Sequence, residues 1–474
     1  MYTFIFDIGK TNIKGAVLNE SGQTVWSQSC ANRSCLDPAY DFPCIDVEDI
    51  WAWLKSTLKA AAGQYPIAAI NVSAHGACVV LVSDEDELLF PVMDYEVDEL
   101  EIAGQSYAEY RPEYSQTLSP DLPGGLNAGR QIWWLKQSYP ERFNQLGQIL
   151  LYPQYWVWKL TGQLVTEATS LGCHTDLWEP MDHRFSTLVG KLGIEDAFPP
   201  LVDCFSSVGS VKKALAEDLG LSESCIVFPG VHDSNGSLAR YLATDLSSPF
   251  NVVSTGTWVI IMAVGNPGDG LLEARDMLAN VDVNGNPVPC ARFMGGREFE
   301  KICQLTGVAT DAPVTQESVQ SIIDDYLFAV PPFEAGSGPF RQNPTTEQLT
   351  GRVSSGTSLA TLYLALMVDY ELELLNAQGP ILFGSASQKN PLLCQLLAQL
   401  RPAQRVYMSN DSASTIKGAW SLTQGQKKAQ KKGQKKMPPG FSDFNDFDIA
   451  QAAQIEGLPD YQKVWRKLAL RENP

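Results

Sequence analysis

The same local pattern occurs twice in this chain, once at the N-terminus and once just past the middle. In each place an apolar stretch leads into a turn with glycine and hydroxyl side chains, and a second apolar stretch follows. The first copy covers residues 4–19 (FIFDIGKTNIKGAVLN) and the second covers residues 251–265 (NVVSTGTWVIIMAVG). Short runs of branched and aromatic residues around such turns predict β-hairpins. We therefore expect two halves that repeat one α/β architecture without repeating sequence.

Further strand and helix patterns follow each hairpin. A third strand is expected at residues 24–29, and the helical spacing of Ile50, Leu54 and Leu58 predicts a helix over Val47–Ala62. Later segments alternate between the two periodicities. We expect strands at residues 66–76, 77–91, 225–230 and 380–386, and helices at residues 131–136, 155–160, 234–242, 358–378, 390–400 and 461–470.

The acidic composition argues against polyanionic partners. The 474 residues are 44% hydrophobic, enough for two or three cores, and 35 Lys and Arg face 54 Asp and Glu, a formal net charge of -19. Such a surface repels nucleic-acid phosphates and anionic lipid, so we expect a small-molecule ligand, no nucleic acid and no membrane. Six lysines lie in one low-complexity run at residues 427–436. We expect a solvated loop there, and a site for an anionic partner is the alternative.

The cysteines and the N-terminus indicate a cytoplasmic protein. The ten cysteines are scattered, form no Cys-x-x-Cys pair and lie mostly among apolar neighbours, so we expect reduced, buried thiols. The chain has four histidines and no His-x-x-x-His pattern, so few zinc ligands are available and no zinc site is expected. The start MYTFIFDIGK has no basic residues before its apolar run, which Asp7 interrupts, so no signal peptide is expected.

The turn of the first hairpin is a candidate phosphate site. It follows Asp7 and offers backbone N–H groups, hydroxyl and amide side chains and positive charge, which would suit a nucleotide phosphate with Mg²⁺. An ordinary hairpin turn is the alternative. A P-loop is rejected, because Phe4 stands where that motif needs its first glycine and a strand follows the turn. The residues of this candidate are Gly9, Lys10, Thr11, Asn12 and Lys14.

Two segments of the second half are candidates for the rest of a nucleotide. The first is the uncharged turn of the second hairpin, and the second follows an apolar strand with small residues against which an adenine ring could lie. An ordinary Ser/Thr turn and close helix packing are the respective alternatives. The residues of the first are Ser254, Thr255, Gly256 and Thr257, and those of the second are Gly384, Ser385, Ala386 and Ser387.

Asp233 is the candidate for proton transfer. It lies in PGVHDSNG, between an apolar strand and a helix, where a helix N-terminus favours the ionised carboxylate and a bound alcohol could donate its proton. The alternative is that Asp233 or Ser234 only caps the helix, and that His232 is a packed side chain.

Taken together, these motifs resemble, in order and spacing, the FGGY carbohydrate kinases of the actin/hexokinase superfamily. The resemblance extends from residue 1 to about residue 424 and includes residues 150–178, which look like the family's segment around the sugar pocket. The matching motifs are DIGKTNIK (7–14), His75-Gly76, PGVHDSNG (229–236), VVSTGTW (252–258), LFGSASQKNPLLCQLLAQL (382–400) and SASTIKGAW (412–420).

The resemblance implies an α/β fold of two RNase H-like (actin/hexokinase-type) domains with a cleft between them. It implies an N-terminal sugar-binding domain at residues 1–244 and a C-terminal ATP-binding domain at residues 245–424. A Lys-rich linker at residues 425–440 and a tail with one helix at residues 441–474 would follow.

The resemblance also implies roles for the motif residues. Asp233 would be the general base, in contact with the sugar, and Asp7 and Asp233 would form the Mg²⁺ site. His75, Gly76 and Asp94 would lie at the sugar. The turn from Gly9 to Lys14 would approach the transferred phosphate, residues 254–257 would hold the β- and γ-phosphates of ATP, and residues 384–387 would border the adenosine.

The implied function is ATP-dependent phosphorylation of a ketose or deoxyketose of the xylulose, ribulose, fuculose or rhamnulose kind. The sequence departs from the family pattern at Lys10, where Thr or Ser is usual, and at residues 383–386, where a glycine triplet is usual. These departures keep open a non-catalytic sugar- or nucleotide-sensing protein, and a short-polyol kinase is a further alternative. A homodimer is also expected.

Overall fold

The computed structural model describes residues 2–40, 42–97, 100, 106–242, 248–342, 347–410, 414–424 and 447–471. The chain forms two compact units, each of which collects separate stretches of sequence. Unit 1 comprises Met1–Asp245, Ala279–Pro287 and Ala413–Ser442, and unit 2 comprises Leu246–Leu278, Val288–Ser412 and Asp443–Pro474.

Unit 1 is built on a seven-stranded sheet with the order β14-β15-β6-β1-β2-β3, in which β16 also pairs with β6. The first hairpin is antiparallel, and β6 runs parallel to β1. The strands are β1 (Tyr2–Ile8), β2 (Asn12–Leu18), β3 (Thr24–Ala31), β6 (Ile67–Ala74), β14 (Gly209–Ser210), β15 (Ile226–Val227) and β16 (Val231–His232).

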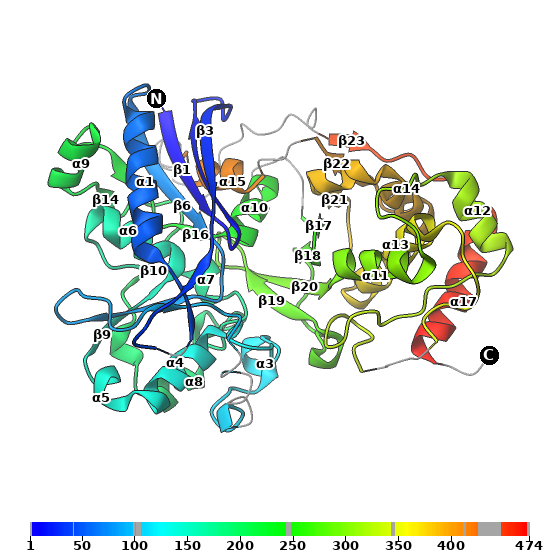
Figure 1. Cartoon of the computed structure of the whole chain (residues 1–474), viewed down its shortest axis with the longest axis horizontal. Helices are drawn as coiled ribbons and strands as arrows, with labels where there is room; N and C mark the ends of the chain where they lie inside the picture. Colours follow the sequence, from blue (N-terminus) through cyan, green and yellow to red (C-terminus); the bar gives the residue numbers. More distant parts are fainter. Residues whose placement is uncertain are drawn as a thin grey trace. The chain divides into compact units, whose positions relative to one another are not determined.

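Helices cover both faces of this sheet because its strands carry apolar side chains on both sides. In β1, Phe4 and Phe6 belong to the core under helix α1 (Val47–Ala62), whereas Ile5 belongs to the core under α10 (Asp233–Leu242) and α15 (Ser414–Leu422). Figure 1 shows α1 running alongside this sheet. A Cβ atom on Gly15 would lie 2.8 Å from Thr57 of α1, so glycine allows this helix to approach β2.

Unit 2 repeats the strand arrangement of unit 1. Its strands run in the order β20-β18-β17-β21-β22-β23, with an antiparallel β17–β18 hairpin and β21 parallel to β17. The expectation of two halves with one architecture is confirmed. The strands are β17 (Phe250–Thr255), β18 (Val259–Val264), β20 (Pro287–Phe293), β21 (Ile381–Phe383), β22 (Val406–Ser409) and β23 (Phe447–Ile449).

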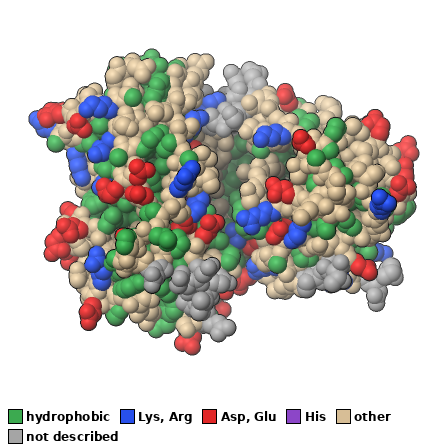
Figure 2. Space-filling view, in the orientation of Figure 1, with side chains coloured by type: hydrophobic (Ala, Val, Ile, Leu, Met, Phe, Trp, Pro, Cys, Tyr) green, Lys and Arg blue, Asp and Glu red, His purple; other side chains and the backbone are tan. Residues whose placement is uncertain are grey.

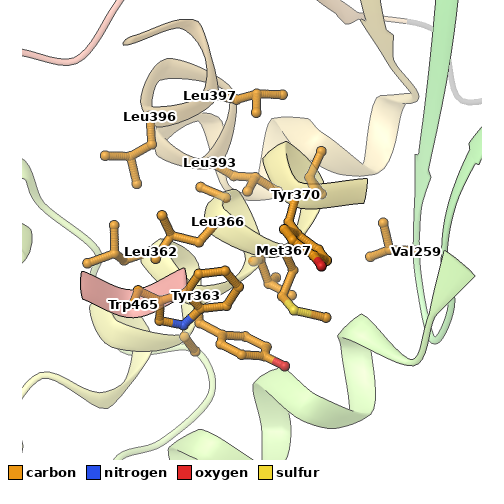
Figure 3. Packing of buried hydrophobic residues seen from close by; sticks show 14 of the residues in the cluster. Val259, Leu362, Tyr363, Leu366, Met367, Tyr370, Leu393, Leu396, Leu397 and Trp465 are labelled. Atoms are coloured by element: carbon orange, nitrogen blue, oxygen red, sulfur yellow. The ribbon is translucent and has the colours of Figure 1, made fainter. Parts of the chain in front are cut away.

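The core of unit 2 surrounds helix α13 (Gly356–Leu374), which is buried along most of its length. Figure 3 shows Tyr363 of α13 beside Trp465 of α17 (Leu458–Leu470), with leucines of α14 (Pro391–Leu400) on the other side of α13. The ring centroids of Tyr363 and Trp465 are 6.3 Å apart. A helix that is apolar all round requires such neighbours on every side, and α17 provides one of them.

The smaller elements complete the two units. Those of unit 1 are β4 (Ser34–Leu36), β5 (Pro43–Ile45), β7 (Val79–Ser83), β8 (Val92–Met93), α3 (Tyr114–Thr117), α4 (Ala128–Ser138), α5 (Pro140–Phe143), β9 (Leu146–Leu151), α6 (Tyr152–Thr161), β10 (Thr166–Glu167), α7 (Ala168–Leu171), β11 (Trp178–Glu179), β12 (Arg184–Phe185), α8 (Thr187–Leu192), η1 (Glu195–Ala197), β13 (Leu201–Val202) and α9 (Lys213–Leu219). Strand β19 (Leu278–Val281) lies at the boundary, and unit 2 adds η2 (Glu273–Arg275), α11 (Gly295–Thr306), α12 (Gln316–Asp324) and η3 (Ser385–Lys389).

The compact units differ from the expected domain boundaries at three places, the first of which is Ala279–Pro287, a stretch of the expected domain 245–424 that belongs to unit 1. Helix α15 lies within the expected domain 245–424, yet it packs in unit 1 against α10, where a Cβ atom on Gly418 would come within 1.7 Å of the Gly236 carbonyl oxygen. The small residues of this helix therefore serve close helix packing. The expected tail 441–474 contributes β23 and α17 to unit 2, because β23 pairs with β22 and α17 fills the core.

Some expectations lie partly or wholly outside the described residues. The Lys-rich run at 427–436, the linker 425–440 and the boundary at 244–245 belong to this group.

The helices of the described ranges are all too short or too polar to be membrane spans. Acidic side chains are spread over the face of the molecule that Figure 2 shows.

Candidate functional site

The parallel strands of unit 1 bring the candidate residues to one edge of the sheet. Strand β6 pairs in parallel with β1 and with β16, and Ser73 of β6 is in register with both Asp7 and Val231. The carboxyl ends of these strands therefore meet at one edge, the usual location of ligand sites in α/β sheets. Asp7 lies near the end of β1, His75 directly follows β6 and Asp233 directly follows β16.

Asp7 is partly buried and lies near a second negative charge. Its partner across the hairpin is Lys14 of β2. Burial, followed by the negative charge of Asp233, raises the pKa of Asp7 to about 7, and the positive charge of Lys14 opposes this rise. The two carboxylates are thus close enough to repel each other.

Asp233 is the first residue of α10, and its side chain is 34% exposed. Its Oδ1 atom accepts a hydrogen bond from the backbone N–H of Ser234 at 2.6 Å. This bond fixes the orientation of the carboxylate at the N-terminus of α10. The capping interpretation of Asp233 therefore has a basis, and the partial exposure leaves the same carboxylate accessible to a ligand.

The two carboxylates fit a magnesium site. Mg²⁺ is usually held by one or two carboxylates together with substrate phosphates. A divalent cation would relieve the repulsion that raises the pKa of Asp7, so the pair of Asp7 and Asp233 suits a metal shared with a nucleotide. In the described part of the chain, no three His, Cys, Asp or Glu side chains form a closed metal cluster.

The His75-Gly76 pair is packed against His232. A Cβ atom on Gly76 would lie 2.6 Å from Nε2 of His232, so only glycine leaves room for this ring. His75 is buried, and the bond between its Nδ1 and the Gly76 carbonyl is 3.0 Å long. Its Nε2 atom is buried without a hydrogen-bond partner. Burial lowers the pKa of both His75 and His232, which keeps the two imidazoles neutral.

A small recess lies beside these histidines. Because it has space for about one water molecule, it is too small for a sugar as it stands. Its lining includes His75, whose Nε2 atom is buried without a hydrogen-bond partner. The recess is lined by His75, Gly76, Ala77, Cys78, Ala128, Leu151, Tyr152, Pro153, Ser170, Thr175 and His232.

The first hairpin turn is closed by its own backbone. The Gly9 N–H donates to the Asn12 carbonyl at 2.9 Å, and the side chain of Asn32 donates to the Gly9 carbonyl at 2.9 Å. A Cβ atom on Gly9 would lie 3.0 Å from the Asn12 carbonyl oxygen. Thr11 and Asn12 are exposed at the turn, as a phosphate site requires.

Lys10 is paired with Asp94, a link that the sequence did not predict. The Lys10 ammonium donates to Asp94 and, at 3.3 Å, to Ser34, and it lies 4.7 Å from the ring centroid of Tyr95. Asp94 is buried, which by itself would raise its pKa. Hydrogen bonds from Lys10, Ser34 and the N–H of Glu96 outweigh burial and lower the pKa of Asp94 below its ordinary value. Asp94 therefore supports the first turn.

The two candidate segments of unit 2 also share one sheet edge. Val253 of β17 and Phe383 of β21 are in parallel register, and the Gly384 N–H donates to the Val253 carbonyl at 3.0 Å. Residues 254–257 and 384–387 therefore follow neighbouring strands. Gly384–Ser387 continues into the short helix η3, and the Ser387 hydroxyl donates back to the Gly384 carbonyl at 2.8 Å.

Sequence reasoning missed a third segment of this edge. The N–H of Gly296, in the first turn of α11, donates to the Thr257 carbonyl at 3.1 Å, and a Cβ atom there would lie 2.4 Å from the Gly256 carbonyl oxygen. The Gly295-Gly296 doublet was the available signal. Arg292 further supports the turn, since it lies 4.7 Å from the ring centroid of Trp258 and binds Asp276.

The structure thus gathers the candidate residues into two groups. In unit 1, Asp7, the first turn, His75, Gly76 and Asp233 lie at one sheet edge, and Asp94 joins them through Lys10. In unit 2, the turn at 254–257 and the segment 384–387 lie at the corresponding edge.

Comparisons with known proteins identify the family. Residues 2–239 match the N-terminal domain of the FGGY family of carbohydrate kinases, and residues 247–432 match the C-terminal domain of carbohydrate kinase FGGY. A solved carbohydrate kinase from Novosphingobium aromaticivorans is 32% identical, with a TM-score of 0.89 over 99% of this chain and 98% of that one. This match also confirms the expected actin/hexokinase-type fold.

Curated relatives are more distant. An L-fuculokinase from Haemophilus influenzae is 26% identical over 64% of this chain, and a probable L-xylulose kinase from Pasteurella multocida is 25% identical over 56%. The aligned stretch spans 66% and 56% of the length of these relatives, respectively. The family match covers both units and agrees with the repeated sheet, and we conclude that the chain belongs to the FGGY family of carbohydrate kinases.

Proposed function

We propose that this protein transfers the γ-phosphoryl group of ATP to a hydroxyl of a ketose or deoxyketose, with Asp233 as the general base. The observation that carries the proposal is the position of Asp233. Its carboxylate begins α10 at the sheet edge that also holds Asp7 and the first hairpin turn, and it is partly exposed. Membership of a carbohydrate kinase family agrees with this chemistry.

The local hydrogen bonds suit a proton acceptor. The Ser234 N–H donates to Oδ1 of Asp233, which orients the carboxylate. A sugar hydroxyl within hydrogen-bond reach of this carboxylate would give up its proton as its oxygen attacks the γ-phosphorus. His75 and Gly76 would then lie against the sugar. Because Gly76 has no side chain, it would leave room for the ring of His232, the residue before Asp233.

The two turns would hold the phosphates. Mg²⁺, when bound at Asp7 and Asp233, would neutralise charge on the phosphates of ATP. The exposed Thr11 and Asn12 would approach the transferred group, and residues 254–257 would hold the β- and γ-phosphates. Residues 384–387, on the neighbouring strand, would border the adenosine.

The acceptor class is proposed from chemistry and from relatives. L-fuculose and L-xylulose are ketoses, and the relatives named for them match more than half of this chain. Around the first turn, Lys10 is already neutralised by Asp94 and lies 3.8 Å from Glu96. This leaves little positive charge for an acidic sugar and supports a neutral one.

Two further expectations stay predictions: a cytoplasmic location, which the ten free cysteines support, and a homodimer.

The proposal is tested by replacing the base. Asp233→Ala should abolish sugar-dependent ADP release, because the carboxylate acts on the acceptor hydroxyl, and it should leave nucleotide affinity nearly unchanged, because Asp7 and the ATP phosphates would still hold Mg²⁺. The measurement compares coupled ADP release with ATP binding by calorimetry. Asp218→Asn, an exposed aspartate of unit 1 that pairs with Lys59, is the control and should keep full turnover. Retained turnover in Asp233→Ala would remove Asp233 from the role of base.

A further inference from the structure

Two cysteine thiols face each other on neighbouring strands of unit 1. Strands β4 and β5 are antiparallel, and Cys35 is in register with Cys44. The two Sγ atoms are 3.1 Å apart, and both thiols are free. Directly opposed residues of an antiparallel pair have Cα atoms about 4.5 or 5.5 Å apart, a separation that a disulfide can span.

The two thiols differ in access. Cys35 is partly exposed, whereas Cys44 is buried. Burial, followed by the hydrogen bond with Cys35, raises the pKa of Cys44 to about 12. Cys35 is therefore the thiol that an external reagent meets first, and Cys44 is the second partner. Among all ten cysteines, which lie within the described residues, Cys30 is the other partly exposed one.

Both strands of this thiol pair also hold Asp94. Ser34, next to Cys35, donates its hydroxyl hydrogen bond to Asp94 and accepts one from Lys10. The carbonyl of Pro43, next to Cys44, accepts the Asp94 N–H at 2.9 Å. The thiol pair is thus one residue away from both supports of the Lys10–Asp94 ion pair.

We propose that Cys35 and Cys44 form a reversible dithiol–disulfide modification site that controls the support of Lys10 at the first hairpin turn. Its effect on turnover rests on the proposed kinase function. The oxidant is an external disulfide of the glutathione class. The Cys35 thiolate attacks one of its sulfurs and one thiolate leaves. Cys44 then loses its proton and attacks Sγ of Cys35, which releases the second thiolate. Two electrons pass to the oxidant, and the two protons end on the released thiols.

Closing the bond has a structural consequence. The Sγ atoms must approach from 3.1 Å to about 2.05 Å, which moves Cys35 and Cys44 toward each other. Because Ser34 and Pro43 flank the cysteines and both bind Asp94, this movement alters how Asp94 holds Lys10. The oxidised protein should therefore turn over more slowly than the reduced one.

The experiment uses the full chain and two separate readouts. The protein is equilibrated with mixtures of oxidised and reduced glutathione, its remaining thiols are alkylated, and its peptides are mapped by mass spectrometry. We expect a Cys35–Cys44 cross-link, lighter by two hydrogen atoms, that dithiothreitol reverses. Sugar-dependent ADP release should fall by about tenfold in the oxidised protein, since small displacements near reacting groups have effects of this order.

Matched variants distinguish oxidation of Cys35 and Cys44 from oxidation of other residues. Cys35→Ser and, as a second variant, Cys44→Ala should keep the turnover of the reduced protein and lose its response to oxidised glutathione. Cys30→Ser should keep that response. If both Cys35 and Cys44 are alkylated after incubation under oxidising conditions, the proposed disulfide site is wrong. If the cross-link forms and turnover does not change, the proposed control of Lys10 is wrong. If no sugar supports turnover, the proposed function fails, whereas the mapped cross-link still supports the site.

Discussion

Carboxylates away from solvent have pKa values that depend strongly on their surroundings. Asp7 gains an unusual pKa from burial and from the charge of Asp233, a pattern common at functional sites. Glu298, in the first turn of α11, is a second case. It is 1% exposed and accepts hydrogen bonds from the Tyr363 hydroxyl and from the N–H groups of Phe333 and Glu334. Burial outweighs these bonds and raises its pKa from 4.5 to about 7.

Glu298 should make stability depend on pH. Between pH 4.5 and 7 the folded chain carries its proton and the unfolded chain does not, so stability falls across this window by up to about 3 kcal/mol and is level above it. The negative charge of Glu334 adds to this rise, and burial raises the pKa of the neighbouring Glu371 well above its ordinary value, which favours its protonated form. Glu298→Gln should flatten this part of the profile, measured by urea unfolding at several pH values. Exposed Glu300→Gln on the same helix is the control. Parallel profiles for Glu298→Gln and the wild type would contradict the assignment.

At the scale of elements, the site depends on glycines that let neighbouring segments touch. Gly76 leaves space for the ring of His232, and the backbone N–H of His232 donates to the Thr169 hydroxyl at 3.1 Å. Gly296 similarly lets the first turn of α11 contact the turn of the second hairpin. In each case the missing side chain fixes the distance between two backbone segments.

Gly76→Ala should disturb the segment that carries Asp233. The new methyl would lie 2.6 Å from Nε2 of His232, so His232 must shift, and Asp233 follows it in sequence. We expect a fall in kcat of about tenfold or more with nucleotide affinity unchanged. Gly209→Ala is the control, because its Cβ atom would be no closer than 3.6 Å to any neighbour. An unchanged kcat for Gly76→Ala would show that this packing does not position the base.

Local patterns predicted the elements better than the contacts between them. Helix α1 has the expected bounds of Val47–Ala62, and both hairpins occur where expected, because their signals lie within a few neighbouring residues. Helix α11 was not predicted, since it begins with two glycines and no side-chain cap. The Lys10–Asp94 pair joins residues 84 positions apart, and no local pattern records such a contact.

At the scale of the whole molecule, the ends of the chain determine what each unit contains. The segment expected to be a tail supplies an edge strand and a core helix to unit 2, because Tyr461 and Trp465 fill space beside α13. Periodicity predicted the helix itself, whereas its docking site depends on aromatic residues from Phe328 to Tyr370 that are distant in sequence.

Trp465→Ala should destabilise unit 2. The indole is 1% exposed, packs against Phe340 and donates to the Ala329 carbonyl at 2.8 Å. Losing a buried side chain of this size costs about 3–5 kcal/mol, with a further cost for the unpaired carbonyl. Urea unfolding followed by peptide hydrogen exchange should place the loss in unit 2, with Lys467→Ala, exposed on the same helix, as the control. A loss below about 1 kcal/mol would contradict the core role of α17.

ATP-dependent phosphorylation of a neutral ketose can be measured directly on the full chain. Coupled ADP release with Mg-ATP is recorded against ketopentoses, 6-deoxyketohexoses, ketohexoses and short polyols, with a no-sugar control. A ketopentose or a 6-deoxyketohexose should give strong ADP release, and the no-sugar control should give almost none. If the protein binds ATP but releases no ADP with any sugar of the panel, the proposed kinase activity is contradicted and a non-catalytic sensor is favoured. ADP release with short polyols alone would contradict the proposed acceptor class.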